Sequence, residues 1–198
     1  MKRFFAIAEL LAVYVTPVAV FYFGLLPYGA RLLFLEVFAA LVILLTITRR
    51  MNLRDMGFRW DTFAPSAKLL LPGTIIAVGV LVVSFLLGIG TEYVFKSWWT
   101  NSFFLYYLAV GAFSQEFGYR GYLLQRLRIV SSNPWFLVIA NSILFSLLHA
   151  LHRDNLVFIG TFIFGLYLTW VYVKRPNILA STLAHGIVGT VAIILGFF

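Results

Sequence analysis

Seven segments of this sequence are apolar over a length that reaches, or nearly reaches, the thickness of a lipid bilayer. A transmembrane helix needs about 20 mostly apolar residues. Of the 198 residues, 62% are apolar and only 11% are charged, whereas about 25% of a soluble domain is charged. The sequence therefore predicts an all-α membrane protein, a bundle of about seven transmembrane helices. The expected spans are Phe4–Leu26, Leu32–Thr48, Leu69–Gly90, Ser102–Leu127, Trp135–Leu151, Asn155–Val173 and Asn177–Phe198.

Basic residues indicate the orientation of the predicted bundle. With a cytoplasmic N-terminus, 12 of the Lys and Arg residues fall on or toward the cytoplasmic side, and only Arg31, Lys96 and Arg153 fall outside. This bias follows the positive-inside rule, so the net charge of +8 does not call for a nucleic-acid partner. The C-terminus is then expected outside. Five tryptophans lie near segment ends or in a flanking loop, as in an aromatic belt: Trp60, Trp98, Trp99, Trp135 and Trp170.

The sequence predicts one integral membrane domain over residues 1–198. The longest polar connection is the stretch of residues 49–68, "RRMNLRDMGFRWDTFAPSAK". Its mixture of basic and apolar residues predicts an amphipathic segment on the inner membrane surface. The chain has no cysteine, so thiolate chemistry and disulfides are excluded. With no room for a soluble domain, any chemistry must take place in or at the membrane.

Polar residues inside the expected spans are candidates for function, because burying them without a partner costs several kcal/mol. At a rise of about 1.5 Å per residue, Gln115, next to Glu116, lies about 16 Å from Arg126 along its helix. By the same rise, His185 lies about 15 Å from Arg175, and His149 about 21 Å from Trp135. In a hydrocarbon layer of about 30 Å, three helices therefore bring polar side chains to a similar depth. This coincidence predicts a polar cavity. The other polar residues in the spans are Glu9, Glu36, Arg120 and Asn141. We interpret Glu9 and Glu36 as reaching toward water, because both lie near helix ends.

Helix geometry separates the two neighbouring polar residues Gln115 and Glu116. Glu116 precedes Arg120 by four residues, which is the favourable order for an ion pair on one helix face. Gln115 shares a different face with Tyr119 and Tyr122. We therefore interpret Glu116 and Arg120 as an internal brace and expect Gln115 to face the cavity. Because an amide does not accept a proton at neutral pH, Gln115 is not a general base.

A zinc site is the alternative for the same polar residues. Two histidines and one carboxylate are a known catalytic ligand set, which here would be Glu116, His149 and His185. However, the HExxH spacing of zinc peptidases is absent, and Glu116 is already assigned to an ion pair. We therefore expect neither a metal nor another cofactor.

Three motifs in the second half of the chain resemble those of the CAAX protease and bacteriocin-processing family (CPBP, or Abi), which is related to the Ras-converting CAAX endoprotease. The EExxxR motif of the family corresponds here to "QEFGYRG", FxxxH to "FSLLH", and HxxxN to "HGIVG". The stretch "LRDMGFRW" resembles the linker usual in the family. The resemblance covers the chain from about residue 50 to its end, and the three motifs together are much more specific than any one of them.

The resemblance implies an intramembrane endoprotease in which a glutamate acts as general base on a water held by the second-motif histidine. The third-motif histidine and asparagine would stabilise the oxyanion. By position, Glu116 and Arg120 match the second glutamate and the arginine of the first motif. His149 and His185 match the two histidines, and Phe145 matches a packing residue. The implied partners are the lipid bilayer and a membrane-anchored or membrane-proximal peptide, in the cell membrane of a bacterium or archaeon.

Two positions depart from the family pattern. Gln115 occupies the place of the presumed base, and Gly189 occupies the place of the asparagine. Losing either group typically lowers a rate by about 10²–10⁴, so the chain as written is expected to be inactive or slow. Gln115 fits either an enzyme inactivated on purpose or a natural pseudoenzyme, and Gly189 favours the second. The alternatives are a non-catalytic scaffold or bacteriocin self-immunity protein and, with less support, a small transporter.

Overall fold

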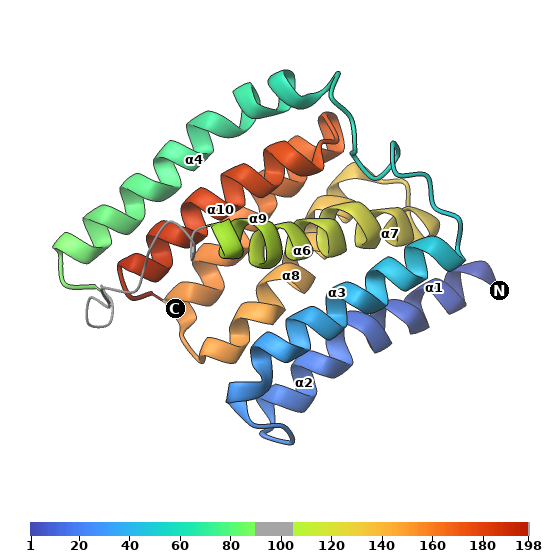
Figure 1. Ribbon diagram of the computed structural model, residues 1–198, viewed down its shortest axis with the longest axis horizontal. Coiled ribbons are helices and arrows are strands. Elements are labelled where there is room, and N and C mark those ends of the chain that lie inside the picture. Colours follow the sequence, from blue (N-terminus) through green and yellow to red (C-terminus); the bar gives the residue numbers. More distant parts are fainter. Residues whose placement is uncertain (90–104, 198) are drawn as a thin grey trace.

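The computed structural model describes residues 1–89 and 105–197, which form helices joined by turns (Figure 1). Lys96, Trp98 and Trp99, which were used above to orient the chain, lie outside these ranges. No strand occurs in the described residues, in agreement with the predicted all-α class. The helices are α1 (Lys2–Leu10), η1 (Leu11–Val15), α2 (Thr16–Tyr22), η2 (Tyr28–Ala30), α3 (Arg31–Thr48), α4 (Phe63–Leu86), η3 (Tyr107–Ala112), α6 (Phe113–Glu116), η4 (Phe117–Leu123), α7 (Leu124–Val130), α8 (Pro134–His149), η5 (Ala150–His152), α9 (Asn155–Lys174) and α10 (Ile178–Ile194).

The described residues contain four helices that are long and apolar enough to cross a membrane. They are the composite helix α1–η1–α2, then α4, the helix formed by α8 with η5, and α9. Two shorter apolar helices cover Leu33–Thr48 and Ile178–Ile194. Helix α4 begins six residues before the predicted start of its span, because Pro65 fits the first turn of a helix without losing a hydrogen bond. The chain is therefore a multi-pass membrane protein.

Asparagine or aspartate side chains begin three of the helices in the second half of the chain. The side-chain oxygens of Asn133, Asp154 and Asn177 accept hydrogen bonds from backbone N–H groups in the first turns of α8, α9 and α10. These N-caps satisfy backbone donors that would otherwise be unpaired at a helix start. They fix where each helix begins, and therefore at what depth it carries its polar residues.

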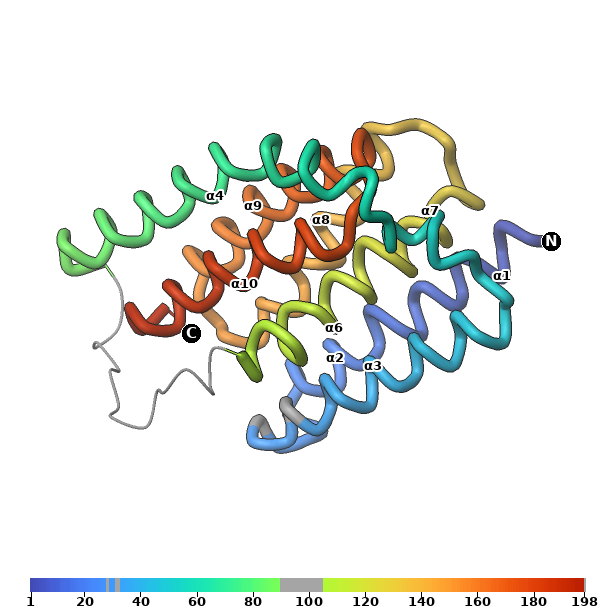
Figure 2. Tube along the Cα trace, turned by 45° about the horizontal axis from the view of Figure 1, so that its top comes forward, coloured from blue at the N-terminus to red at the C-terminus, as the bar shows by residue number. Residues whose placement is uncertain are grey.

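A helix of mixed character runs through the centre of the bundle. It continues without a break through η3, α6, η4 and α7, and Figures 1 and 2 show it between α3 on one side and α10 on the other. Every residue from Gln115 to Leu124 on this helix is buried. By contrast, α4 lies on the outer flank against α9 and α10, and most of its surface is exposed. The central helix thus holds its polar residues away from lipid.

The connection between α3 and α4 forms a series of turns, and its predicted place on the membrane surface stays a prediction. Met56 is fully buried in the main hydrophobic core, and its carbonyl accepts a 2.6 Å hydrogen bond from the Tyr172 hydroxyl. Gly57 has a φ of +87° and approaches so closely that a Cβ there would lie 3.1 Å from the backbone nitrogen of Ile178. The connection therefore packs onto the start of α10 because its apolar side chain finds a protein core rather than lipid.

Candidate active site

Glu116, the last residue of α6, joins two other polar side chains in the middle of the bundle. It is completely buried, and its Oε1 accepts a 2.9 Å hydrogen bond from Arg120 Nη1, so the ion pair predicted from the i,i+4 spacing is present. The same oxygen lies 2.8 Å from Nδ1 of His185 on α10. A carboxylate only accepts hydrogen bonds, so this Nδ1 carries the proton. Glu116 therefore orients an imidazole in addition to pairing with the arginine, a contact that the helix-face argument did not predict.

The ring of Phe145 on α8 forms the apolar centre of the same site. Its centroid lies 4.9 Å from that of His149 and 5.4 Å from that of His185. The guanidinium carbon of Arg120 lies 4.1 Å from the Phe145 centroid, and the Tyr119 ring meets Phe145 edge-on at 5.4 Å. Three helices thus bring both candidate histidines and the Glu116–Arg120 pair around one aromatic ring.

Both histidines have their Nδ1 atoms held by acceptors. In His149, Nδ1 lies 3.1 Å from the backbone carbonyl oxygen of Phe145, and a carbonyl oxygen cannot donate. A neutral His149 therefore has its proton on Nδ1 and its lone pair on Nε2, as does a neutral His185 beside its carboxylate. His152 lies in η5, and its ring is stacked on that of His149 with the centroids 6.3 Å apart. The tautomers leave both Nε2 atoms able to accept a proton.

Gln115 lies beside this cluster with few protein partners for its amide. It is 8% exposed, and its Oε1 is buried without a hydrogen-bond partner among the described residues, as are Oε2 of Glu116 and Nε and Nη2 of Arg120. Buried polar atoms generally hydrogen-bond to protein or ordered water. Four such atoms on three neighbouring residues therefore mark a polar site suited to water or to a polar group of a bound molecule.

The central helix widens into π-helical turns on both sides of α6, a geometry that is frequent at functional sites. Side chains from other helices support its backbone there. The Gly118 carbonyl accepts a 2.6 Å hydrogen bond from the Tyr14 hydroxyl, and the Tyr119 carbonyl accepts one of 2.6 Å from Asn141 Nδ2. Asn141 Oδ1 in turn accepts from the Thr169 hydroxyl at 2.9 Å. Asn141, a candidate from the sequence, thus ties α8 and α9 to the widened helix.

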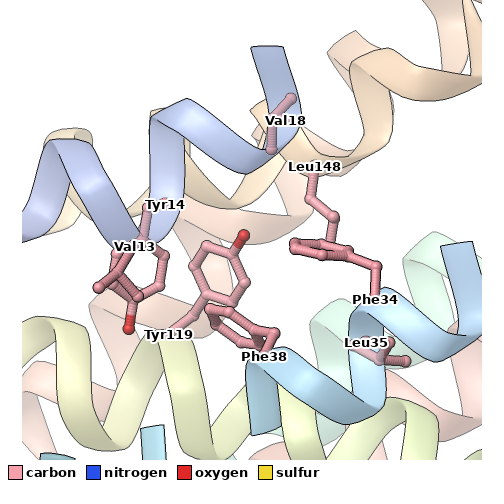
Figure 3. A pocket seen from close by; sticks show the side chains of 8 residues that line it. All are labelled: Val13, Tyr14, Val18, Phe34, Leu35, Phe38, Tyr119 and Leu148. Atoms are coloured by element: carbon pink, nitrogen blue, oxygen red, sulfur yellow. The ribbon is translucent and has the colours of Figure 1, made fainter. Parts of the chain in front are cut away.

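A small apolar cavity of about 10 Å³ lies on the N-terminal side of the site, between the first helices and the central one (Figure 3). Its volume is close to the minimum for a single water. The Tyr119 ring separates it from Phe145, which Tyr119 contacts edge-on. The cavity is lined by Val13, Tyr14, Val18, Phe34, Leu35, Phe38, Tyr119 and Leu148.

Within the described ranges, no group of three or more His, Cys, Asp or Glu residues is arranged to hold a metal ion. Glu116 Oε1 is shared between Arg120 and His185, and His185 presents a protonated Nδ1 to it.

A second buried carboxylate was not recognised from the sequence as a paired residue. Glu9 was expected to reach toward water, but its side chain is only 11% exposed and pairs with Arg49 and Arg126. It also accepts a hydrogen bond from the Tyr122 hydroxyl. These contacts join α1 to the end of α3 and to the central helix. An acidic residue in the first span and basic residues at the ends of two others were the only sequence signals for this cluster.

Residues 97–191 match the family model described as Type II CAAX prenyl endopeptidase Rce1-like. This range includes all three motifs noted in the sequence, but the match begins after the "LRDMGFRW" linker. No curated protein and no solved structure matched the chain. The match agrees with the resemblance noted from the motifs, and residues 97–191 of the chain are similar to the Rce1-like type II CAAX prenyl endopeptidases.

Proposed function

We propose that this protein is an intramembrane endoprotease-like protein that directs water at a peptide bond of a membrane-anchored or membrane-proximal substrate. The observation that carries the proposal is the buried contact of 2.8 Å between Glu116 Oε1 and His185 Nδ1. His149 lies on the same Phe145 ring. A carboxylate that orients an imidazole whose other nitrogen is open is a recurrent arrangement of hydrolytic sites. The family match supports this reaction class.

Each polar residue has a proposed role. His149 holds the attacking water through Nε2, since its Nδ1 is bound to a backbone carbonyl. His185 stabilises the negative charge that develops on the carbonyl oxygen when both of its nitrogens carry a proton, with Nδ1–H donating to Glu116 and Nε2–H to the oxyanion. Arg120 neutralises Glu116 and fixes its orientation, because an unpaired carboxylate at this depth would be costly. Gln115 occupies the position from which a carboxylate would take the proton of the water.

The amide of Gln115 lowers the expected rate. A positioned general base contributes about 10²–10⁴ to a rate, and a neutral amide cannot take up the proton. The remaining candidates for proton transfer are the two imidazoles. We therefore expect the chain to cleave slowly or not at all, while it still holds a substrate in the same site.

The proposed topology has seven spans, a cytoplasmic N-terminus and an external C-terminus, in the cell membrane of a bacterium or archaeon. The basic connections gather at one end of the bundle. There, the Thr62 and Ser66 hydroxyls donate to the carbonyls of Pro176 and Arg175 at 2.7 and 2.8 Å. The two termini lie at opposite ends in Figure 1. An excess of basic residues at one end favours that end as the cytoplasmic one.

Replacing Gln115 by glutamate tests the proposal. The Q115E protein in liposomes is expected to cleave a quenched fluorescent farnesylated CAAX peptide about 10²–10⁴-fold faster than the parent chain. The variant Q115E/H149A serves as a matched control that should return to the parent rate. A folded Q115E protein as inactive as the parent would refute the protease function.

A second candidate function is a non-catalytic scaffold or a bacteriocin self-immunity protein of the same fold. The observation that favours it is the pair of departures, Gln115 and Gly189, on the two helices that meet at Glu116 and His185. The test is affinity capture of a membrane partner by the parent chain and by the double variant H149A/H185A. Capture that is independent of both histidines would support a scaffold, whereas loss in the double variant would count against it.

A further inference from the structure

A tyrosine from the start of the central helix lies directly on the glycine of the third motif. A Cβ added at Gly189 would lie well inside contact distance of the Tyr107 hydroxyl oxygen and 2.9 Å from the ring carbon that bears it. Gly189 is buried on α10, and Tyr107 is half-buried on η3. The phenol thus fills the space that any side chain at position 189 would occupy.

Close packing of η3 on α10 explains how the Tyr107 ring is held. Leu108 lies over Gly186 in the same way as Tyr107 lies over Gly189, and the Tyr107 ring also covers Gly111 on its own helix, where a Cβ would lie 2.8 Å from a ring carbon. The two glycines of α10 therefore admit two neighbouring side chains of η3. Packing accounts for the ring, but an apolar ring would pack equally well, so packing alone does not account for the hydroxyl.

The Tyr107 hydroxyl lies against α10 at Gly189, one helical turn from His185. Gly189 follows His185 by four residues, so the two lie one above the other on the same face of α10. Glu116 on the central helix meets the same helix α10 at His185, with Oε1 2.8 Å from Nδ1. Tyr107, His185 and Glu116 therefore belong to one polar site, to which the central helix contributes twice.

We propose that the Tyr107 hydroxyl is a catalytic hydrogen-bond donor that stabilises the oxyanion of the reacting carbonyl, together with His185. This inference rests on the proposed protease function and adds to it a donor from outside the three motifs. When the water oxygen bonds to the carbonyl carbon, one water proton passes to Nε2 of His149, or to the new carboxylate in Q115E. The π electrons of the carbonyl move to its oxygen, and the phenol O–H donates to that oxygen. When the tetrahedral intermediate collapses, the electron pair returns, the C–N bond breaks, and the leaving nitrogen takes the proton that the base had accepted. The phenol itself remains protonated throughout.

The same geometry explains why residue 189 is a glycine. An asparagine at position 189 would collide with the phenol of Tyr107, so a donor can come from position 107 or from position 189, but not from both. The chain would then have moved the donor from α10 to η3 while keeping it at the same place in the bundle. This exchange makes the effect of paired substitutions predictable.

Cleavage of the farnesylated CAAX peptide by variants of Q115E tests the donor. Loss of one oxyanion donor lowers kcat by about 10²–10³, so Y107F/Q115E is expected to lose about that much with an unchanged KM. The exchange Y107A/G189N/Q115E should recover most of the rate, and Y107A/Q115E should not. The matched control is Y106F/Q115E, because the exposed neighbour Tyr106 has its hydroxyl 3.5 Å from Glu36. An unchanged kcat in Y107F/Q115E overturns the inference.

Binding of a substrate mimic separates failure of this inference from failure of the protease function. The probe is a prenylated peptide aldehyde, whose hydrate resembles the tetrahedral intermediate, compared with the matching alcohol by thermophoresis in detergent. The parent chain is expected to bind the aldehyde at least about 10-fold more tightly than Y107F does, with equal affinities for the alcohol. This arm decides the role of Tyr107 even if Q115E does not cleave. Equal aldehyde affinities, or no aldehyde binding by the parent, overturn the inference.

Discussion

Two carboxylates on different helices, Glu9 and Glu116, both pair with arginines, yet their surroundings differ. Glu9 uses both oxygens, with Arg49 on one, Arg126 Nε 2.9 Å from the other, and the Tyr122 hydroxyl as a further donor. Glu116 uses only Oε1, and its Oε2 has no protein partner among the described residues. One carboxylate is saturated by the protein, and the other keeps an oxygen available.

The difference separates a structural clamp from a chemical site. The partners of Glu9 come from the end of α3 and from the central helix, and the carboxylate sits near the basic end of the bundle, where Arg49 is 40% exposed. Saturated contacts of this kind hold helices together but leave nothing to react. The side chains of Glu116 and Arg120 are fully buried, and both have polar atoms without a hydrogen-bond partner among the described residues. Glu116 is also hydrogen-bonded to the imidazole of His185. Buried ionisable groups that are incompletely paired are typical of functional sites.

Removing Arg120 should produce the largest effect and would test whether the Glu116 site depends on its charge balance. The variant R120M leaves a fully buried carboxylate with only His185 as a polar partner. Breaking a buried ion pair in this way costs about 3–5 kcal/mol. SDS-induced unfolding in detergent micelles measures the free energy of unfolding, and R128M, at an exposed position on α7, is the matched control. A loss below about 1 kcal/mol would show that Arg120 does not balance Glu116.

Replacing Glu9 should have a smaller effect and should leave the chemistry intact. The variant E9Q keeps the shape of the side chain but removes the charge shared by Arg49 and Arg126. Hydrogen bonds to charged groups contribute about 1.5–3 kcal/mol, so the free energy of unfolding should fall by about that amount. In the Q115E background, cleavage by folded protein should not change. A loss of kcat without a loss of stability would mean that the two carboxylates are coupled.

The sequence predicted local relations at these two sites better than distant ones. The Glu116–Arg120 pair follows from a spacing of four residues, and the common depth of Gln115, His149 and His185 follows from the rise of a helix. Which residue His185 would meet depends on the rotation of α10 against the central helix, and the π-helical turns change that rotation. Neither this rotation nor the π-helical turns can be predicted from the spacing of residues along the chain.

The contacts of Glu9 and Tyr107 could not be predicted from the sequence for the same reason. Glu9 meets Arg126, which is 117 positions away in the chain, and this contact depends on the first helix packing against the central one. Tyr107 reads as one aromatic residue among many in an apolar segment. Its position becomes informative only because Gly189 lies opposite. The polar residues in the sequence thus indicated a site, but the contacts between its residues could be identified only from the packing of the helices.

The salt dependence of stability provides a further way to distinguish the ion pairs of Glu9 and Glu116. Because Arg49 is 40% exposed, the variant R49Q is expected to lose about 0.5–1 kcal/mol. At about 1 M NaCl the screening length shrinks to about 3 Å, so most of this difference should disappear. The loss in R120M should persist, since a fully buried pair is screened much less. SDS unfolding at low and high salt measures both, and an R49Q loss that is insensitive to salt would place this pair in a dry environment.

The smallest expected effect belongs to a third, exposed ion pair, which marks the lower end of the comparison. Asp61, in the connection before α4, is paired with Arg59 at 2.6 Å and its side chain is 52% exposed. The hydrogen bond from Arg59 lowers the pKa of Asp61 below its ordinary value of 3.8. A carboxyl whose pKa is lower in the folded state stabilises the fold above its unfolded pKa and loses this contribution as the pH falls through the folded value.

The parent chain should therefore lose a little more stability on acidification below about pH 4 than D61N does. At neutral pH the two should differ only slightly, because solvent screens an exposed pair. SDS unfolding across this pH range measures the difference, and N52A, at an exposed position in the same connection, controls for changes in the loop itself. Parallel pH profiles for the parent and D61N would show that the Arg59–Asp61 contact contributes nothing to folding. Exposure, rather than the number of charges, would then decide which ion pairs of this protein stabilise it.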